Sequence, residues 1–445
     1  MIELVDNNRN KPEEFPFDRF TDFLPYANKD IKELCKEHEQ LLVFPHSVLD
    51  ADDRIGDSPI FSVEFDTNNK VRVYTGNIMG FIGVKRQRMK IRSRFDSSNN
   101  DYFLHYMLEK VFHLKFNLFN LHFGSDNDDI LNILMFVFPV FLHKAIMQGI
   151  YREYRRFDYN DSNVRGTIDI ARHISINIPF QGKVAYSMRE HTADNNLMQL
   201  IRHTLEYILS QKIGRAILSA SKDAADDIQQ IYAYTQTYNK NERQRVLQKN
   251  LRPFSHPYYT AYRPLKQLCL QILRYENSMY ADNNNEITGI LFDGAWLWEE
   301  YVSTLLPDDF IHPKNKRGSG RRYLFMDNRG PRFPDYYKEG VIVLDAKYKR
   351  FEGKKHLAAV DRDDIHQLVT YMYMLRVKDS AFVYPVRQVA PHDVASNLVG
   401  YGGTMHLYGI RVCETAKDYE DFCNAMRESE KEFLNNIITI KEAIC

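Results

Sequence analysis

The spacing of apolar positions divides the chain into three stretches of different character. In residues 1–100, short β-branched or alternating runs such as "IFSVEFD" and "RMKIRSRF" are separated by Asp, Asn, Gly and Pro, which is typical of strands and turns. In residues 101–285, apolar residues recur every three or four positions, as in "YFLHYMLEKVFHLKF". This spacing predicts a mainly helical middle domain with one strand-like insertion at 164–170.

The polar run "ADNNNEITG" at 281–289 marks the expected start of a third domain, residues 286–445, in which helical and strand patterns alternate. We expect a helix in "AWLWEEYVSTLL", strands near 323–326, 331–335 and 341–348, and a helix in "DIHQLVTYMYML", followed by further strands and a charged C-terminal helix. The predicted fold class is α/β and multidomain, with a β-rich N-terminal module, a helical middle and a C-terminal α/β domain.

Composition excludes several classes of protein. The 445 residues contain 59 Lys and Arg against 59 Asp and Glu, so the net charge predicts no partner. Five scattered cysteines without a CxxC pair argue against a disulfide framework or a zinc site and suit the cytoplasm. The most apolar run, 130–142, is shorter than the roughly 20 residues of a membrane-spanning helix. No GxxxxGK[ST] phosphate loop occurs, so we expect no nucleotide hydrolysis by this chain alone.

Candidate chemistry lies in "RFPDYYKEGVIVLDAKYKRF", residues 332–351, where a buried strand is predicted to end in charged residues. Asp345 and Lys347 would share one face of that strand, and Asp335, expected at the end of the preceding strand, would be brought close by a turn at Gly340. Converging carboxylates repel unless a cation lies between them, and Mg²⁺ prefers oxygen ligands. The pattern indicates metal-assisted phosphodiester hydrolysis, with Lys347 offsetting charge in the transition state. The alternative is a surface hairpin that ends in a solvated ion pair.

The two flanking helices supply further candidates. Glu299 or Glu300 would reach the metal site from the first helix, and the alternative is a solvated helix face. Gln367 and Tyr371 lie one turn apart on the second helix, where they would hold the lysine or a DNA strand. The alternative for these two residues is a half-buried polar pair.

These residues resemble a known family. Pro334-Asp335 with Asp345-Ala346-Lys347 resembles the PD-(D/E)xK nuclease signature, and Gln367 with Tyr371 resembles the QxxxY element of its RecB-like branch. In order, "YTGNIMGFIGV", "VRGTIDI", "FDGAWLWEEYV" and "LDAKYK" resemble the McrC subunits of modification-dependent restriction systems, between about residues 70 and 375.

The resemblance implies a restriction-endonuclease-like αβββαβ core in residues 286–445. Asp335 and Asp345 would be metal ligands, Lys347 the catalytic lysine and Glu299 the helix acid. It also implies a Mg²⁺-dependent DNA endonuclease subunit for anti-phage defence, which works with a McrB-like AAA+ GTPase. In such systems the N-terminal part, here residues 1–100, docks on the partner and stimulates its hydrolysis.

Two basic segments are candidate binding surfaces. In "KRQRMKIRSRF" five cations alternate with other residues and would line one strand face toward phosphates or an acidic partner: Arg86, Arg88, Lys90, Arg92 and Arg94. In "KNKRGSGRRY" a flexible basic loop would clamp DNA: Lys316, Arg317, Arg321 and Arg322. The alternatives are a solvated strand face and an ordinary solvated loop.

Two other functions remain open from the sequence. One is a non-catalytic assembly factor that only activates the AAA+ motor, although a scaffold has no need of the acid-acid-lysine cluster. The other is a motor-independent DNA repair nuclease, which the long portion outside the nuclease domain disfavours.

Overall fold

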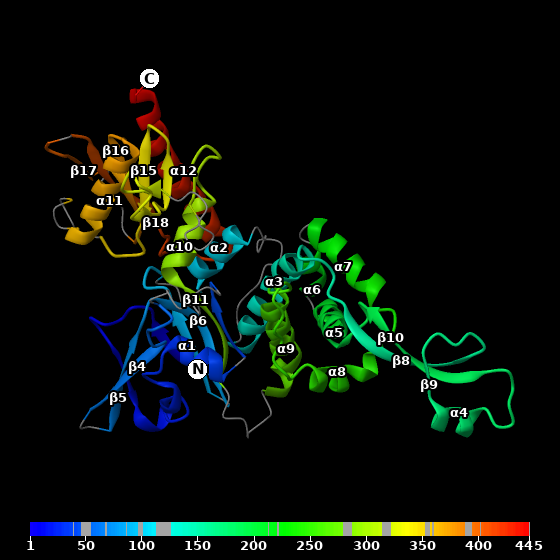
Figure 1. The fold of residues 1–445 in the computed structure, drawn as a ribbon. Coiled ribbons are helices and arrows are strands. Elements are labelled where there is room, and N and C mark those ends of the chain that lie inside the picture. Colours follow the sequence, from blue (N-terminus) through cyan, green and yellow to red (C-terminus); the bar gives the residue numbers. More distant parts are fainter. Residues whose placement is uncertain are drawn as a thin grey trace. The chain divides into compact units, whose positions relative to one another are not determined.

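Figure 1 shows the computed structural model of the chain. The structure describes residues 1–38, 40–45, 55–66, 69–85, 87–96, 101–112, 126–211, 213–219, 222–278, 287–313, 322–351, 357, 360–387, 394–400 and 402–444. Helices and several separate sheets alternate along the chain, which confirms the expected mixed α/β class. No helix in these described ranges is long and apolar enough to cross a membrane.

The chain forms two compact units, and each is described by itself. The first unit combines residues 1–126 with residues 281–445, and the second contains residues 127–280. The expected N-terminal and C-terminal domains therefore belong to the same unit. The division of the chain into three domains at residues 100 and 285 stays a prediction.

The N-terminal part of the first unit is built on a mixed sheet. Its strands follow the spatial order β1 (Ile2–Val5), β7 (Gln87–Arg92), β6 (Ile78–Val84), β11 (Ile287–Asp293) and β3 (Leu41–Phe44). β11 pairs with β6 and β3, so the segment expected to open the third domain completes the N-terminal sheet. The reason is burial, because Ile287, Ile290 and Leu291 of β11 are fully covered.

A second, antiparallel sheet and short helices pack beside this sheet. The sheet has the order β2 (Glu13–Pro16), β5 (Lys70–Thr75) and β4 (Phe61–Phe65), and the helical segments are η1 (Phe17–Arg19), η2 (Leu24–Tyr26) and α1 (Ile31–Glu37). Phe20, Phe23 and Phe61 form the aromatic centre of the shared core. The prediction of strands in residues 1–100 is confirmed for β1 to β7.

The C-terminal part of the first unit has its own sheet. The spatial order is β14 (Tyr336–Lys338), β15 (Ile342–Ala346), β16 (Asp379–Val386), β18 (Thr404–Arg411) and β17 (Val394–Asn397). β15, β16 and β18 run parallel, while β14 and β17 are antiparallel to their neighbours. Helices α10 (Gly294–Ser303) and α11 (Arg362–Leu375) both contact β15, which explains why its apolar run is buried.

The strands before β15 differ from the expectation. The predicted strands at 323–326 and 331–335 shrink to a small separate hairpin, β12 (Arg322–Tyr323) and β13 (Pro331–Arg332). The segment predicted as a turn contains β14 instead, because Tyr336 and Tyr337 are both buried between neighbouring elements. On the other side of β14, Ile311 forms an isolated β-bridge with Tyr337. The described residues therefore contain only part of the expected αβββαβ arrangement.

Three helices of the first unit meet around one buried carboxylate. Helix α12 (Tyr419–Ile444) carries Glu430, whose Oε1 accepts hydrogen bonds from Tyr106 of α2 (Tyr102–Val111), at 2.7 Å, and from Tyr301 of α10, at 2.8 Å. These bonds join the N-terminal part, α10 and the C-terminal helix. They fix α10, which carries the candidate acids.

The second unit contains helices and a long hairpin. Its helices are α3 (Asp126–Ile146), α4 (Ile170–Ile176), α5 (Asn196–Ser210), α6 (Gly214–Leu218), α7 (Lys222–Tyr234), η5 (Lys240–Glu242), α8 (Arg243–Lys249) and α9 (Tyr262–Ser278). The expected strand at 164–170 is confirmed only as β9 (Thr167–Ile168), which pairs with the long strand β10 (Val184–Thr192), and β10 pairs on its other side with β8 (Glu153–Asp161). These strands carry β9 and α4 at their far end (Figure 1). The sequence pattern missed β8 because its half-buried positions are not consistently apolar: Arg155 alternates there with Phe157 and Tyr159.

Candidate active site

The hairpin of β14 and β15 brings the two predicted aspartates together. In its antiparallel register Tyr336 lies opposite Leu344, and one further step places Asp335 opposite Asp345. Asp335 therefore directly precedes β14, instead of ending the previous strand as expected. Its Oδ2 accepts a hydrogen bond of 2.7 Å from the backbone N–H of Ala346, which fixes the carboxylate at the end of β15.

Lys347 lies beside these acids as predicted. Its Nζ is 2.7 Å from Asp345 Oδ2, 3.0 Å from Gln367 Oε1 and 3.4 Å from Asp364 Oδ1. Asp345 is only 1% exposed, so a solvated surface ion pair does not describe this strand end. The backbone N–H of Lys347 donates to Val383 O at 2.8 Å and continues the ladder of β15 with β16.

Helix α11 connects the lysine to the segment before Asp335. Gln367 Nε2 donates to Tyr371 Oη at 2.9 Å, and the Tyr371 hydroxyl donates to the backbone oxygen of Phe333 at 3.3 Å. Gln367 and Tyr371 therefore share a helix face, as their spacing predicts, and Gln367 contacts the lysine directly. The amide can hold the ammonium group in place because its oxygen accepts from Lys347.

Both glutamates of α10 lie near the same histidine. His312 Nε2 is 3.9 Å from Glu299 Oε1 and 4.0 Å from Glu300 Oε1, and His312 Nδ1 lies 2.7 Å from Asp335 O. Because a carbonyl oxygen only accepts, Nδ1 carries a proton. The charge of Glu299 contributes to raising the pKa of Asp335, which favours Glu299 as the acid of the site.

Burial and repulsion control the charges of the site. Burial, followed by the charges of Asp345 and Glu299, raises the pKa of Asp335 well above its ordinary value. Burial also raises the pKa of Asp345, although Lys347 opposes this effect. Burial alone would lower the pKa of Lys347, but Asp345, Asp335 and Asp364 outweigh it and raise the pKa. The lysine therefore stays protonated and faces several carboxylates.

The donor set fits a hard divalent cation. Asp335, Asp345 and Glu299 offer oxygen atoms only, and after burial the charges of Asp345 and Glu299 raise the pKa of Asp335, so a cation among these carboxylates would offset their repulsion. Within the described ranges no three His, Cys, Asp or Glu side chains are arranged as a ready metal cluster. Mg²⁺ characteristically uses one or two carboxylates and completes its octahedron with waters and substrate phosphate, so the aspartate pair suffices.

Three residues of the site were missed from the sequence. Lys349 Nζ is 2.6 Å from Asp364 Oδ2, and the same carboxylate contacts Lys347. The sequence could have indicated Lys349, because it continues the spacing of two that relates Asp345 to Lys347. No sequence pattern indicated Asp364 or His312, because they do not belong to the strand that carries Asp345.

The expected row of cations along β7 is not an exposed binding surface. Lys90 is buried with its Nζ 2.7 Å from Asp101 Oδ2, and Arg94 is buried with its Nη1 2.7 Å from Asp6 Oδ2. The prediction fails at these positions because Lys90 is paired with Asp101, the residue before α2, and Arg94, which follows β7, is packed against Asp6 and Tyr348.

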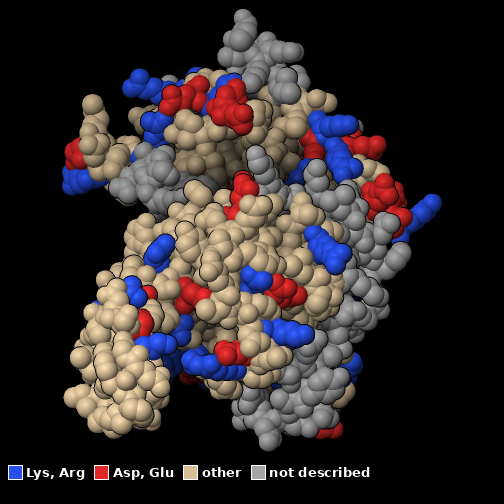
Figure 2. All heavy atoms as spheres, turned by 90° about the vertical axis from the view of Figure 1, so that its right-hand side faces the viewer, with Lys and Arg blue, Asp and Glu red and all other residues tan. Residues whose placement is uncertain are grey.

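The outer members of that row are also engaged. Arg92 Nε is 3.4 Å from Glu3 Oε2, and Arg88 Nη1 donates to the backbone oxygens of Lys85 and Gln87. Arg86 lies outside the described residues. Among the described residues that Figure 2 draws, basic and acidic side chains are interspersed.

The second basic cluster falls mostly outside the described residues, which include Arg322 but not Lys316, Arg317 or Arg321. Arg322 Nε donates to Tyr337 Oη at 3.0 Å, and its Nη2 contacts Glu339. Arg322 thus stabilises the β14 hairpin, and the role of the loop as a clamp stays a prediction.

Comparison with known proteins decides the family. The family model described as "McrBC 5-methylcytosine restriction system component" matches residues 73–385. The chain belongs to this McrBC family. The match includes the second unit, large parts of the first unit and the candidate active site, and it confirms the resemblance to McrC subunits drawn from the sequence.

Solved McrBC structures show a weaker likeness. A chain of the half-complex from the tetradecameric assembly of Thermococcus gammatolerans McrB AAA+ hexamers with bound McrC is 15% identical, with 96% of this chain and 99% of that chain covered and a TM-score of 0.49. A chain of the cryo-EM structure of the T. gammatolerans McrBC complex is also 15% identical, with 69% and 87% covered and a TM-score of 0.33. At these scores the likeness supports no conclusion, and the McrBC assignment rests on the family model. Comparison with curated proteins found no match.

Proposed function

We propose that this McrBC-family chain is the Mg²⁺-dependent DNA endonuclease subunit of its restriction system, with a PD-(D/E)xK active site at the end of β15. The observation that carries the proposal is the convergence of Asp335 and Asp345, opposite each other in the hairpin register, with Lys347 Nζ 2.7 Å from Asp345. Restriction requires that DNA phosphodiesters be cut, and this cluster has the chemistry for that reaction.

Each residue of the cluster has a distinct role in the proposed reaction. Asp335 and Asp345 bind the metal, with Glu299 as the additional acid on α10. When bound, Mg²⁺ polarises the phosphodiester and lowers the pKa of a coordinated water. Lys347 places its positive charge where negative charge develops in the transition state, and Gln367 holds the ammonium group in that position.

The proposed partner is a McrB-like AAA+ GTPase in the same cytoplasm. The matching family describes one component of a restriction system, which implies further components, and this sequence has no phosphate loop of its own. A division of labour follows, in which the partner hydrolyses the nucleotide and this chain cuts DNA. A non-catalytic activator of the motor and a motor-independent repair nuclease remain the alternatives.

The proposal is tested by cleavage of methylated and unmethylated plasmid by the purified chain together with its AAA+ partner, nucleotide and Mg²⁺. We expect wild-type protein to cut and Asp345→Ala to lose cutting while it still stimulates nucleotide hydrolysis. Asp363→Ala is the matched control, because Asp363 is an exposed aspartate on α11. If wild type and Asp345→Ala stimulate hydrolysis equally and neither cuts, the chain is a motor activator and the proposal fails. Cutting by wild type without the partner would support the repair nuclease.

A further inference from the structure

A cavity of about 1220 Å³ opens beside the candidate active site, inside the first unit. One wall contains Ala346 and Lys347 and continues to Arg350. The opposite wall comes from the N-terminal module, where residues 5–8 and 10–13 line the cavity. The candidate nuclease centre and the first dozen residues of the chain therefore border the same space.

The lining is polar and carries more positive than negative groups. Its acidic members are Asp6, Glu13 and Asp361. The cationic members, twice as many, are Lys11, Arg94, Lys347, Lys349, Arg350 and Arg387. Four of these cations, Arg94, Lys347, Lys349 and Arg387, form ion pairs with protein carboxylates, but Lys11 is exposed and forms no ion pair with any residue that the structure describes. The cavity thus offers positive charge next to the lysine of the site.

The N-terminal wall is held rigidly by buried hydrogen bonds. Asn8 is buried, its Nδ2 donates to Val73 O at 3.0 Å, and its Oδ1 accepts from Thr75 N at 2.8 Å. Lys11 follows three residues later, and its backbone N–H donates to Asn8 O at 2.7 Å. The loop that presents Lys11 is therefore preorganised.

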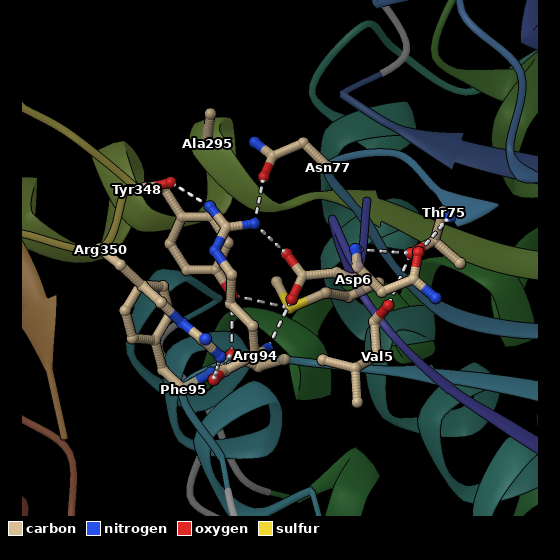
Figure 3. A network of polar contacts seen from close by, with 12 residues as sticks. Val5, Asp6, Thr75, Asn77, Arg94, Phe95, Ala295, Tyr348 and Arg350 are labelled. Atoms are coloured by element: carbon tan, nitrogen blue, oxygen red, sulfur yellow. Dashed lines mark hydrogen bonds and ion pairs between the residues drawn. The ribbon is translucent and has the colours of Figure 1, made fainter. Parts of the chain in front are cut away.

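Arg94 lines the cavity and contacts residues of both walls (Figure 3). Its guanidinium contacts Asp6 Oδ2 at 2.7 Å, Asn77 Oδ1 at 2.8 Å and the backbone oxygen of Tyr348, the residue after Lys347. Arg350 Nη2 donates back to Arg94 O at 2.8 Å. The N-terminal module and the strand that carries Lys347 are therefore fixed relative to each other on either side of the cavity.

We propose that this cavity binds the sugar-phosphate backbone of DNA next to the phosphodiester that is cut, and that Lys11 contacts one of its phosphates. The inference rests on the proposed function and adds to it, because it makes the N-terminal module a wall of the substrate channel as well as a partner-docking element. DNA fits the lining because its backbone carries one negative charge per 3.4 Å of each strand, so one segment can meet several cations in succession. A phosphodiester at Lys347 requires that the adjoining backbone lie in the neighbouring space.

The test is the binding of a fluorescently labelled DNA duplex to the full chain without Mg²⁺, measured over a series of salt concentrations. Lys11→Glu should weaken binding several-fold, equally for methylated and unmethylated sequences, and should reduce the slope of log affinity against log salt by about 1. Lys11→Ala removes the same phosphate contact and should reduce the slope by about as much, but it should weaken binding less because it adds no negative charge. Lys36→Glu is the matched control, because Lys36 is also exposed on the N-terminal module but does not line the cavity.

The outcomes separate this inference from the proposed nuclease function. If wild type cuts DNA while Lys11→Glu and Lys36→Glu bind with equal affinity and salt slope, the cavity does not hold DNA and the inference is overturned. If Lys11→Glu alone reduces the slope but wild type never cuts, the cavity binds DNA and the nuclease proposal fails. A loss of affinity limited to methylated DNA would overturn the assignment of Lys11 to a backbone phosphate.

Discussion

Two buried lysine–aspartate pairs in the first unit have the same geometry and different surroundings. Lys347 and Asp345 at the end of β15 are 2.7 Å apart, as are Lys90 of β7 and Asp101. The side chains of Lys90 and Asp101 are 5% and 0% exposed, whereas Lys347 keeps 15% exposure beside an aspartate at 1%. Lys347 lines a cavity and contacts Asp364 and Gln367 as well, while Lys90 lies inside the N-terminal sheet.

The difference shows that a short, buried ion pair does not by itself identify an active site. Replacing one partner of a fully buried pair leaves the other charge without compensation, which is a cost to folding. A pair that opens onto a cavity, among several acids, can exchange its partners for a metal and a substrate. Access from solvent therefore separates the catalytic pair from the structural pair.

The largest expected effects come from replacing the lysine of each pair by alanine. Lys90→Ala should lower the free energy of unfolding by about 3–5 kcal/mol, because the carboxylate of Asp101 stays buried without its partner. Lys347→Ala should reduce cleavage roughly 1000-fold, since it removes a charge that stabilises the transition state, and should destabilise the fold far less. Urea unfolding and plasmid cleavage measure the two effects.

The double variant Lys90→Met with Asp101→Leu is the control for the stability effect, because it removes both charges and should recover most of the lost stability. Equal losses of stability in Lys90→Ala and Lys347→Ala would erase the distinction between the two pairs.

The pH dependence of stability should sharpen the comparison on the structural side. Burial raises the pKa of Asp6 from 3.8 to about 6, against the opposing charge of Arg94. A carboxyl that binds its proton more tightly when folded contributes stability below about pH 4, and this contribution is lost as the pH rises through about 6. Relative to Asp6→Asn, wild type should therefore lose about 3 kcal/mol of unfolding free energy across this window.

Urea unfolding of wild type and Asp6→Asn at several pH values between about 4 and 7 measures this loss. Asp18→Asn is a control for general charge effects, since Asp18 is exposed on the same module. Parallel stability curves for wild type and Asp6→Asn would contradict the raised pKa.

The smallest expected effect concerns the orientation of the catalytic lysine. Gln367→Leu removes the acceptor 3.0 Å from Lys347 Nζ and the donor to Tyr371, so cleavage should fall about 10-fold, as expected for one hydrogen bond to a charged group. His366→Ala on the same helix is the control, because His366 is exposed. Single-turnover cleavage would measure the effect, and an unchanged rate for Gln367→Leu would show that Asp345 and Asp364 alone position the lysine.

The sequence by itself determined the features that depend on local order. The apolar run at 342–344 predicted a buried strand, and the period of two placed Asp345 and Lys347 on one side of it. The spacing of Gln367 and Tyr371 placed both on one helix face. The motifs also indicated the McrBC family, because they are short segments read in order.

Only the tertiary structure decided which distant segments meet. The register of the β14 hairpin placed Asp335 opposite Asp345 from the start of a strand that the sequence pattern had assigned to a turn. Contacts with Asp101 and Asp6, which the local sequence pattern does not indicate, buried Lys90 and Arg94, which looked exposed from their alternation. The same sheet took in β11 across nearly two hundred residues of intervening chain. Strand order and burial arise from contacts between residues far apart in the chain, and the local alternation of polar and apolar residues does not encode them.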